Sequence, residues 1–233
     1  MWPDTVKAIY VLCHPTKEKE RYERLIPHLL QRGIPGDRLH VWAPTWGSEL
    51  TNQQIFTAYN PYLERPPLPT FSFKGANLTR GEISLGINFA TAVLNVASSP
   101  EQGLIMFLES DIWLREDFVP RLNDLLQDTK GRSWDYLSLG EGVGTRPPGA
   151  LSYYSPTKAY TPPHQWVFRC TDSMLFTTEY LRRLSRTVLP FKEIIDWEMN
   201  FQLMLHRGTA LWADPPLAEQ GTCYSRVITT LPA

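Results

Sequence analysis

Cysteine is scarce in this chain of 233 residues, and the few cysteines are scattered. Cys13, Cys170 and Cys223 are an odd set, and no two of them form a Cys-x-x-Cys pair. Such a set favours neither a disulfide framework nor a zinc site, and it is typical of a reducing compartment. We therefore expect a cytoplasmic protein.

An excess of charge and long apolar runs are also missing. The formal net charge is -1, from 23 basic and 24 acidic residues, which does not favour broad binding to nucleic acid or to an anionic membrane. No apolar run approaches the roughly 18 residues needed to span a bilayer. The N-terminal segment has only a short apolar run after Asp4, which is not typical of a secretion signal. We expect no nucleic-acid partner and no membrane span.

The residues that are present favour a layered α/β protein. Hydrophobic residues make up 42% of the chain, enough for a sizeable core, and the length suits one domain over 1–233. Residues 6–13 have the composition of a strand, residues 21–33 carry apolar side chains at helical spacing, and residues 39–43 again favour a strand. This order of strand, helix and strand predicts parallel strands.

The rest of the chain continues the alternation, interrupted by two proline-rich segments at 60–70 and 141–164. The second segment is long and rich in tyrosine, so we expect it to cover a functional site. The remaining expected helices lie at 79–99, 117–127, 178–188 and 196–208, and the remaining expected strands at 103–108, 134–140, 165–177 and 210–214.

An acidic tripeptide follows the most apolar of these strands. Residues 103–108 do not alternate with polar residues, which predicts a strand buried on both faces, and Glu109-Ser110-Asp111 comes directly after it. Two carboxylates placed two positions apart can bind one divalent ion, and oxygen ligands suit Mg²⁺ or Mn²⁺. The alternative is a strand end whose acids only meet solvent. We expect Asp111, with Glu109, to contact a metal.

The segments around this turn resemble glycosyltransferase family 25, which includes lipopolysaccharide and collagen galactosyltransferases. The resemblance lies in LTRGEISLGINF from Leu78 and in LIMFLESDIWLREDF from Leu104, and it extends loosely to IYVLCHPTKEKERYERL and PPLAEQGTCYSRV. Two departures stand out, because the family's middle acid is Ser110 here and its Ser-His pair is Asn88-Phe89. The second departure puts the choice of donor or acceptor in doubt.

This resemblance implies a GT-A type, Rossmann-like α/β/α sandwich with a mostly parallel central sheet. The donor would be a UDP- or GDP-sugar bound by residues 1–115, and a carbohydrate acceptor would be bound by residues 116–233. It further implies an inverting, metal-dependent transfer with Mn²⁺ or Mg²⁺, in the synthesis of a surface glycan such as lipopolysaccharide.

The general base is expected among three acids. Asp196 and Glu198 lie two positions apart on a predicted helix, so only one of them can face a bound sugar. Glu198 shares a face with Gln202 and His206, which we expect to be solvated. The resemblance favours Asp196 as the base, Asp196 could otherwise simply cap its helix, and Asp172 is a third candidate.

The remaining site predictions concern the two substrates. Arg80 at a helix N-terminus suits phosphate oxygens, the end of the first strand suits a nucleoside, and aromatic side chains in irregular segments suit sugar faces. Only the resemblance suggests Gln220. The predicted donor-binding residues are Leu12, Cys13, His14, Thr16, Arg21, Asn77, Arg80, Ser110 and Gln220, and the predicted acceptor-binding residues are Asp172, Trp166 and Tyr154.

Three alternatives to this interpretation stay open. A nucleotidyltransferase usually has a glycine-rich phosphate loop after its first strand, and residues 13–19 (CHPTKEK) contain no glycine. A transferase that has lost its activity and only binds carbohydrate is consistent with the two departures. A retaining transferase of the same fold is consistent with everything above, because stereochemistry leaves no mark in the sequence.

Overall fold

The computed structural model describes residues 1–68, 77–142, 146–164, 166–168 and 170–221. Their architecture is α/β, with a central sheet of seven strands in the order β2-β1-β3-β7-β5-β8-β6. The strands are β1 (Val6–Leu12), β2 (Leu39–Val41), β3 (Leu104–Glu109), β5 (Tyr136–Ser138), β6 (Lys158–Tyr160), β7 (Ser173–Thr177) and β8 (Ala210–Asp214), while β4 (Ile112–Leu114) and β9 (Ala218–Gln220) form a separate pair.

The strand directions are less uniform than expected. Strands β2, β1, β3, β5 and β8 run in one direction, whereas β7 and β6 run against them. Because β7 lies between β3 and β5, it makes antiparallel pairs with both. The expected mostly parallel sheet is therefore a mixed sheet, in which most strands share one direction but half of the neighbouring pairs are antiparallel.

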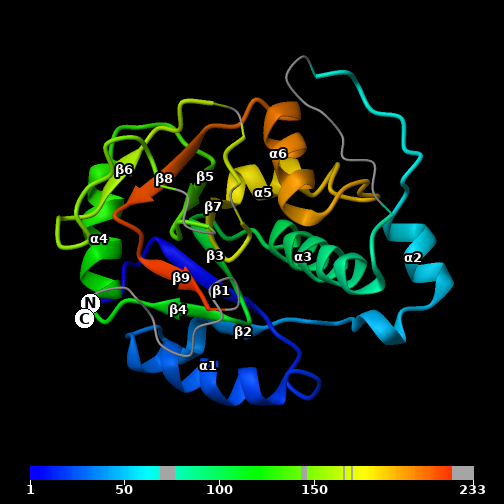
Figure 1. Cartoon of the computed structure of the whole chain (residues 1–233), viewed down its shortest axis with the longest axis horizontal. Coiled ribbons are helices and arrows are strands. Elements are labelled where there is room, and N and C mark those ends of the chain that lie inside the picture. Colours follow the sequence, from blue (N-terminus) through cyan, green and yellow to red (C-terminus); the bar gives the residue numbers. More distant parts are fainter. Residues whose placement is uncertain (69–76, 143–145, 165, 169, 222–233) are drawn as a thin grey trace.

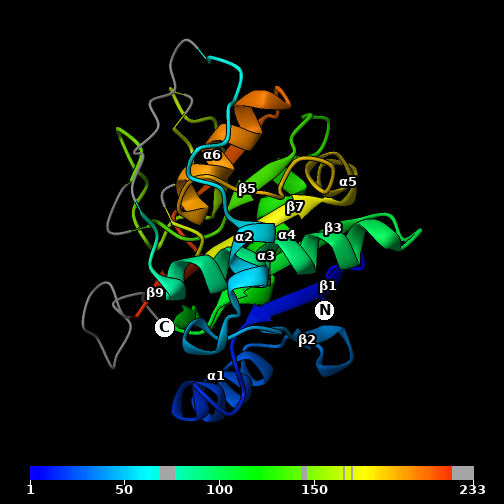
Figure 2. The same ribbon diagram turned by 90° about the vertical axis from the view of Figure 1, so that its right-hand side faces the viewer.

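Helices cover both faces of this sheet (Figures 1 and 2). The described helices are α1 (Lys19–Gln31), α2 (Asn52–Ala58), α3 (Arg80–Ser98), α4 (Phe118–Asp128), α5 (Thr178–Leu184) and α6 (Ile195–Leu205). One core joins α3, α5 and α6 to side chains such as Tyr10 and Phe107, and the other joins α1 and α4 to side chains such as Val11 and Met106. Alternate residues of β1 and β3 enter opposite cores, so the expected burial of β3 on both faces is confirmed.

The chain reverses its direction across the sheet between β1 and β3. It leaves β1 through α1 on one face to reach β2, and it returns through α3 on the other face to reach β3 on the opposite side of β1. In open α/β sheets, ligands bind outside the carboxyl ends of the strands at such a reversal. The ends of β1 and β3 are Leu12 and Glu109.

Local capping explains why α3 begins where it does. The Thr79 hydroxyl accepts a hydrogen bond from the Glu82 backbone N–H, and the Glu82 carboxylate accepts one from the Thr79 N–H at 2.7 Å. This reciprocal arrangement satisfies two backbone donors that a helix start leaves without partners. It fixes the residue at which the first turn of α3 begins.

The sequence missed several short elements. Helix α2 and strands β4, β6 and β9 have three to seven residues each, too few to show a clear hydrophobic period. Helix α6 begins at Ile195 after Ile194, so Asp196 lies within its first turn instead of capping it. In the part of the chain that the structure describes, no helix is both long and apolar enough to cross a lipid bilayer.

Candidate functional site

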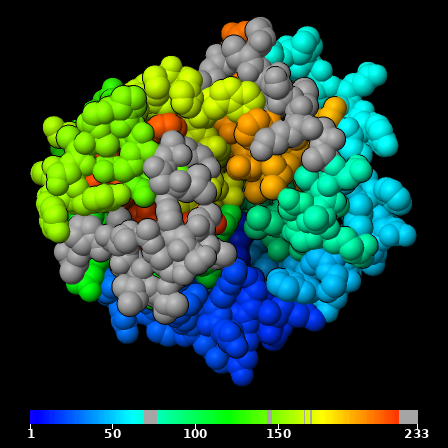
Figure 3. All heavy atoms as spheres, in the orientation of Figure 1, coloured from blue at the N-terminus to red at the C-terminus, as the bar shows by residue number. Residues whose placement is uncertain are grey.

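A cavity of about 720 Å³ opens at the reversal point, beside the carboxyl ends of β1 and β3. Figure 3 shows this face hollowed between the blue atoms of the N-terminal segment and the teal atoms of α3. The structure brings together in its lining seven residues that were predicted from sequence: Leu12, Arg21, Arg80, Glu109, Ser110, Asp111 and Gln220.

The acidic turn forms one wall of this cavity. Glu109 is the last residue of β3, and Asp111 comes just before β4. The carboxylate of Glu109 accepts hydrogen bonds from the Thr171 hydroxyl and from Gln220 Nε2, the latter at 3.1 Å. The backbone oxygen of Asp111 accepts a hydrogen bond from the Gly221 N–H at 2.9 Å. The turn is thus held from two other parts of the chain, 171–172 and 220–221.

Negative charge accumulates around Glu109. Burial raises the pKa of this carboxyl to about 8, the Thr171 hydrogen bond opposes that rise, and the charges of Asp111, Asp172 and Asp196 add to it. These four acids come from β3, the turn after it, the residue before β7, and α6. A cation bound among them would relieve their mutual repulsion.

The donor set fits a divalent ion that is only partly coordinated by protein. Among the described residues, no three His, Cys, Asp or Glu side chains are arranged to enclose a metal. Mg²⁺ usually binds one or two carboxylates and takes its other ligands from water and phosphate oxygens. Glu109 and Asp111 both line the cavity, so each of the two predicted ligands is in a position to contact such an ion.

Ser110 connects the acidic turn to the loop between β1 and α1. Its hydroxyl donates to Glu18 Oε1 at 2.7 Å and accepts from Arg21 Nη1 at 3.0 Å. Glu18 also accepts from the His14 backbone N–H at 2.9 Å. The serine at the middle of the turn therefore orients a carboxylate from another segment, and Glu18 and Arg21 both line the cavity.

The opposite wall is the segment 43–51, which is fastened to α3. Arg80 Nε donates to the Gly47 carbonyl at 3.0 Å, and Arg80 Nη2 donates to the Leu50 carbonyl. Gly47 packs directly on the backbone of Gly81, because a Cβ added to Gly47 would lie only 2.9 Å from the Gly81 Cα. Two of the guanidinium nitrogens predicted to bind phosphate are thus used to hold this wall.

Asn88 and Phe89, the second departure from the resemblance noted in the sequence, have structural roles here. The Asn88 amide oxygen accepts from the Thr45 N–H at 3.0 Å, and its nitrogen donates to the Thr45 carbonyl at 3.1 Å. Phe89 is fully buried and contacts the rings of Phe107 and Phe176. Asn88 therefore fixes the wall at Thr45, while Phe89 fills the core.

The other predicted donor contacts have different positions. The side chain of Cys13 is fully buried in the core with α1, and Cys13 does not line the cavity, so its predicted contact with the donor stays a prediction. Burial also raises the pKa of its thiol to about 12. Asn77 is exposed before α3, and neither it nor His14 or Thr16 lines the cavity. These three stay predictions without a structural contact to support them.

A second cavity of about 490 Å³ adjoins the first and shares Glu18, Arg21 and Trp46 with it. The His14 ring lies edge-on to Trp46 at 5.7 Å between centroids. Lys17 pairs with Glu49 and so joins the β1–α1 loop to the segment 43–51, although both side chains are considerably exposed. This ion pair lies at the rim of the site.

Three consecutive residues of α6 have three different environments. Asp196 is half-buried, its charge acts on Glu109, and its carboxylate accepts from the Trp197 N–H at 2.8 Å. Trp197 packs against Trp166, with 4.6 Å between ring centroids. Glu198 is fully buried and pairs with Arg65 Nη1 at 2.7 Å.

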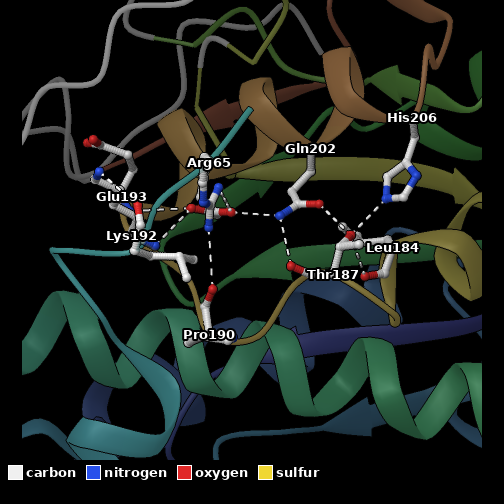
Figure 4. A network of polar contacts seen from close by, with 10 residues as sticks. Arg65, Leu184, Thr187, Pro190, Lys192, Glu193, Gln202 and His206 are labelled. Atoms are coloured by element: carbon white, nitrogen blue, oxygen red, sulfur yellow. Dashed lines mark hydrogen bonds and ion pairs between the residues drawn. The ribbon is translucent and has the colours of Figure 1, made fainter. Parts of the chain in front are cut away.

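Glu198 belongs to a buried polar network, which Figure 4 shows along α6. Besides Arg65, its carboxylate accepts from the Lys192 and Glu193 backbone N–H groups and from Gln202 Nε2. Gln202 in turn contacts Thr187, which contacts His206. The expectation that this face is solvated is wrong. Glu198 is an ion-pair partner within the protein, so we no longer consider it a general base.

The predicted acceptor residues do not form one group. Trp166 lies against Trp197, next to Asp196. Asp172 is buried, where its carboxylate accepts from the Ser173 N–H at 2.8 Å and its carbonyl accepts from the Glu109 N–H. Tyr154 is 81% exposed on a segment that Arg121 and Arg146 fasten to α4 and β8. Of the described part of 141–164, no residue lines the main cavity.

Comparison with models of known protein families finds no match to this chain, and comparison with curated proteins finds none either. The site therefore has to be interpreted from its own chemistry. Sequence reasoning missed Glu18, Arg65 and Trp197, of which Glu18 lines the cavity. For Glu18, the available signal was its charge within the segment 13–21, which is part of the resemblance. For Arg65, no neighbouring residue indicated a role.

Proposed function

We propose that this protein is a glycosyltransferase of GT-A type that moves a sugar from a nucleotide-sugar donor to a carbohydrate hydroxyl. The observation that carries the proposal is the cavity at the β1–β3 reversal point, with the acidic turn in its wall. A volume of about 720 Å³ suits a nucleoside diphosphate with an attached sugar. The resemblance to glycosyltransferase family 25 supports the same assignment.

A divalent cation fits the donor proposal electrostatically. Glu18, Glu109 and Asp111 line the cavity. Of the two arginines in the lining, Arg21 and Arg80, Arg80 already donates hydrogen bonds to the backbone of the segment 43–51. An anionic diphosphate would meet repulsion from these acids unless a cation lay between them. Bound Mn²⁺ or Mg²⁺, held by Asp111 with Glu109, would supply charge neutralisation for the departing nucleotide.

The chain's own residues would perform the remaining chemistry. Asp196 on α6 is close enough to the acidic turn for its charge to act on Glu109, and it is half-buried instead of fully enclosed. As general base it would take the proton of the acceptor hydroxyl while that oxygen attacks the anomeric carbon. In the inverting form of the reaction this is a single displacement. The Trp166–Trp197 pair beside Asp196 offers an apolar surface for the acceptor.

Thermal stabilisation by nucleotides tests the proposal. UDP, GDP and CMP are each added with Mn²⁺ or with EDTA, and the melting temperature is measured. We expect one nucleotide to raise it only with metal, and Asp111→Asn to abolish the rise. Asp124→Asn, which changes an exposed acid on α4, is the matched control and should behave as wild type.

Two other results would lead to different functions. Binding of nucleotides without any transfer or hydrolysis of a sugar nucleotide would favour a carbohydrate-binding protein that has lost activity. Release of diphosphate from a nucleoside triphosphate would favour a nucleotidyltransferase. If a glycoside is formed, NMR of its anomeric proton distinguishes inversion from retention.

A further inference from the structure

Glu18 is a carboxylate that the structure orients at the wall of the main cavity. It lies in the β1–α1 loop, six residues beyond the end of β1, and its side chain is 17% exposed. It is the residue that caps α1 by position, yet its side chain makes no capping hydrogen bond to the helix. Its carboxylate is directed to the acidic turn instead.

Three donors fix the orientation of this carboxylate. The Ser110 hydroxyl and Arg21 Nη1 reach Oε1 at 2.7 and 3.4 Å, and the His14 N–H reaches Oε2 at 2.9 Å. An ionised carboxylate has about four lone-pair positions, so it retains acceptor capacity beyond these contacts. Because the carboxylate only accepts, a ligand at this wall must bring its own donors.

The surroundings of Glu18 favour a hydroxyl ligand over a metal ion or a cationic ligand. Glu18, Glu109 and Asp111 all line the cavity, but they do not form a three-acid metal group in the described chain. Arg21 already neutralises part of the Glu18 charge and would repel a cationic ligand. A pair of adjacent hydroxyl groups, each of them an O–H donor, matches the acceptor positions that remain on the Glu18 carboxylate.

We propose that Glu18 binds the ribose diol of the nucleotide in this cavity. This inference rests on the proposed function. Ribose is the part of a nucleoside diphosphate that offers two neighbouring hydroxyls, and carboxylates at the reversal point of other α/β sheets bind ribose hydroxyls. Glu18 also borders the adjoining cavity, so the nucleoside end lies at this boundary next to Trp46. Ser110 is then a positioning residue that holds Glu18.

Calorimetry with ribonucleotides and their 2′,3′-dideoxy counterparts tests this assignment. UDP, dideoxy-UDP, GDP and dideoxy-GDP are titrated with Mn²⁺ into wild type, Glu18→Ala and Glu18→Gln, and folding is checked by thermal unfolding. For the ribonucleotide that binds, we expect wild type to bind it about tenfold or more tightly than the dideoxy form, and Glu18→Ala to lose this preference. Glu18→Gln keeps one acceptor oxygen, so we expect the ratio of the affinities for the ribonucleotide and its dideoxy form to fall at least about threefold.

Glu23→Ala is the matched control, because Glu23 is exposed on the neighbouring helix α1 and lines neither cavity. It should retain the preference for the ribonucleotide. An equal loss of affinity for both forms in Glu18→Ala, or no loss at all, would overturn the assignment while leaving the proposed function intact. Failure of wild type to bind any of UDP, GDP and CMP in the presence of metal would overturn both.

Discussion

Arg65 and Glu198 form a buried ion pair of 2.7 Å between side chains that are 133 residues apart in sequence. Arg65 also donates to the Pro190 carbonyl, and its guanidinium lies 4.2 Å from the centre of the Phe201 ring. The pair therefore fastens the proline-rich segment before α3 to α6, the helix that carries Asp196.

Loss of Arg65 should destabilise the fold. Arg65→Met leaves the Glu198 carboxylate buried without its cation, so we expect the free energy of unfolding to fall by about 3–5 kcal/mol. Urea denaturation followed by circular dichroism measures the change. Lys19→Met, which removes an exposed partner of Glu23, is the control and should shift the unfolding midpoint very little.

The double variant Arg65→Met with Glu198→Gln separates charge from packing. Without a buried charge to compensate, it should recover most of the stability lost in Arg65→Met, and the two changes should be strongly non-additive. Simple addition of the two single effects would show that the pair contributes through packing alone.

Asp196→Asn should separate chemistry from nucleotide binding. The amide cannot take up the acceptor's proton, so we expect turnover to fall about 10²- to 10⁴-fold. Binding of the nucleotide with metal should be unchanged, because Asp196 is not part of the cavity lining. Steady-state kinetics and calorimetry on the same preparation measure both. Near-normal turnover would exclude Asp196 as the base and direct attention to Asp172.

His28 should make stability depend on pH. Its Nε2 accepts a hydrogen bond from the Leu114 N–H, and burial, with Arg32 and Arg24 nearby, lowers the pKa of the imidazole to about 4. In the unfolded chain the pKa is about 6.5, so between these values the unfolded state binds more protons. The free energy of unfolding should thus fall as pH decreases from about 6.5 to about 4. His28→Gln should show a shallower fall in the same range.

Gly86 on α3 should not tolerate a methyl group. A Cβ there would lie 2.7 Å from the ring of Phe191, which is itself buried. We expect Gly86→Ala to cost about 1–3 kcal/mol through overpacking, measured by thermal or chemical unfolding. On the same helix, a Cβ at Gly81 meets nothing closer than 3.9 Å, so Gly81→Ala should instead be neutral or slightly stabilising. A stabilising effect at both positions would contradict the packing argument.

The long periodic elements could be predicted from the sequence because their signals are local. Helix α3 has a capping box and an apolar stripe, and β3 has an uninterrupted apolar run. The direction of β7 could not be predicted, since it depends on which strands it joins. The burial of Glu198 was missed because its compensating cation, Arg65, lies far away in sequence within a proline-rich segment.

Much of the candidate site was predicted for a related reason. In a layered α/β fold, strand ends converge at one edge of the sheet, so Leu12, Glu109 and Asp111 could be expected together. Beyond the end of a strand, the direction of a side chain no longer follows the two-residue alternation of the strand. That is why Cys13 was assigned to the site although it enters the core, and why Glu18 was not considered.

The ion pair between Lys17 and Glu49 has a consequence for how molecules enter the site. It bridges two walls that belong to separate segments, yet its side chains are 38% and 57% exposed, and exposed pairs contribute at most about 1 kcal/mol. An arriving anion can compete for Lys17 at little energetic cost. Because screening by salt weakens such a contact, the connection between these two walls of the site should loosen as ionic strength rises.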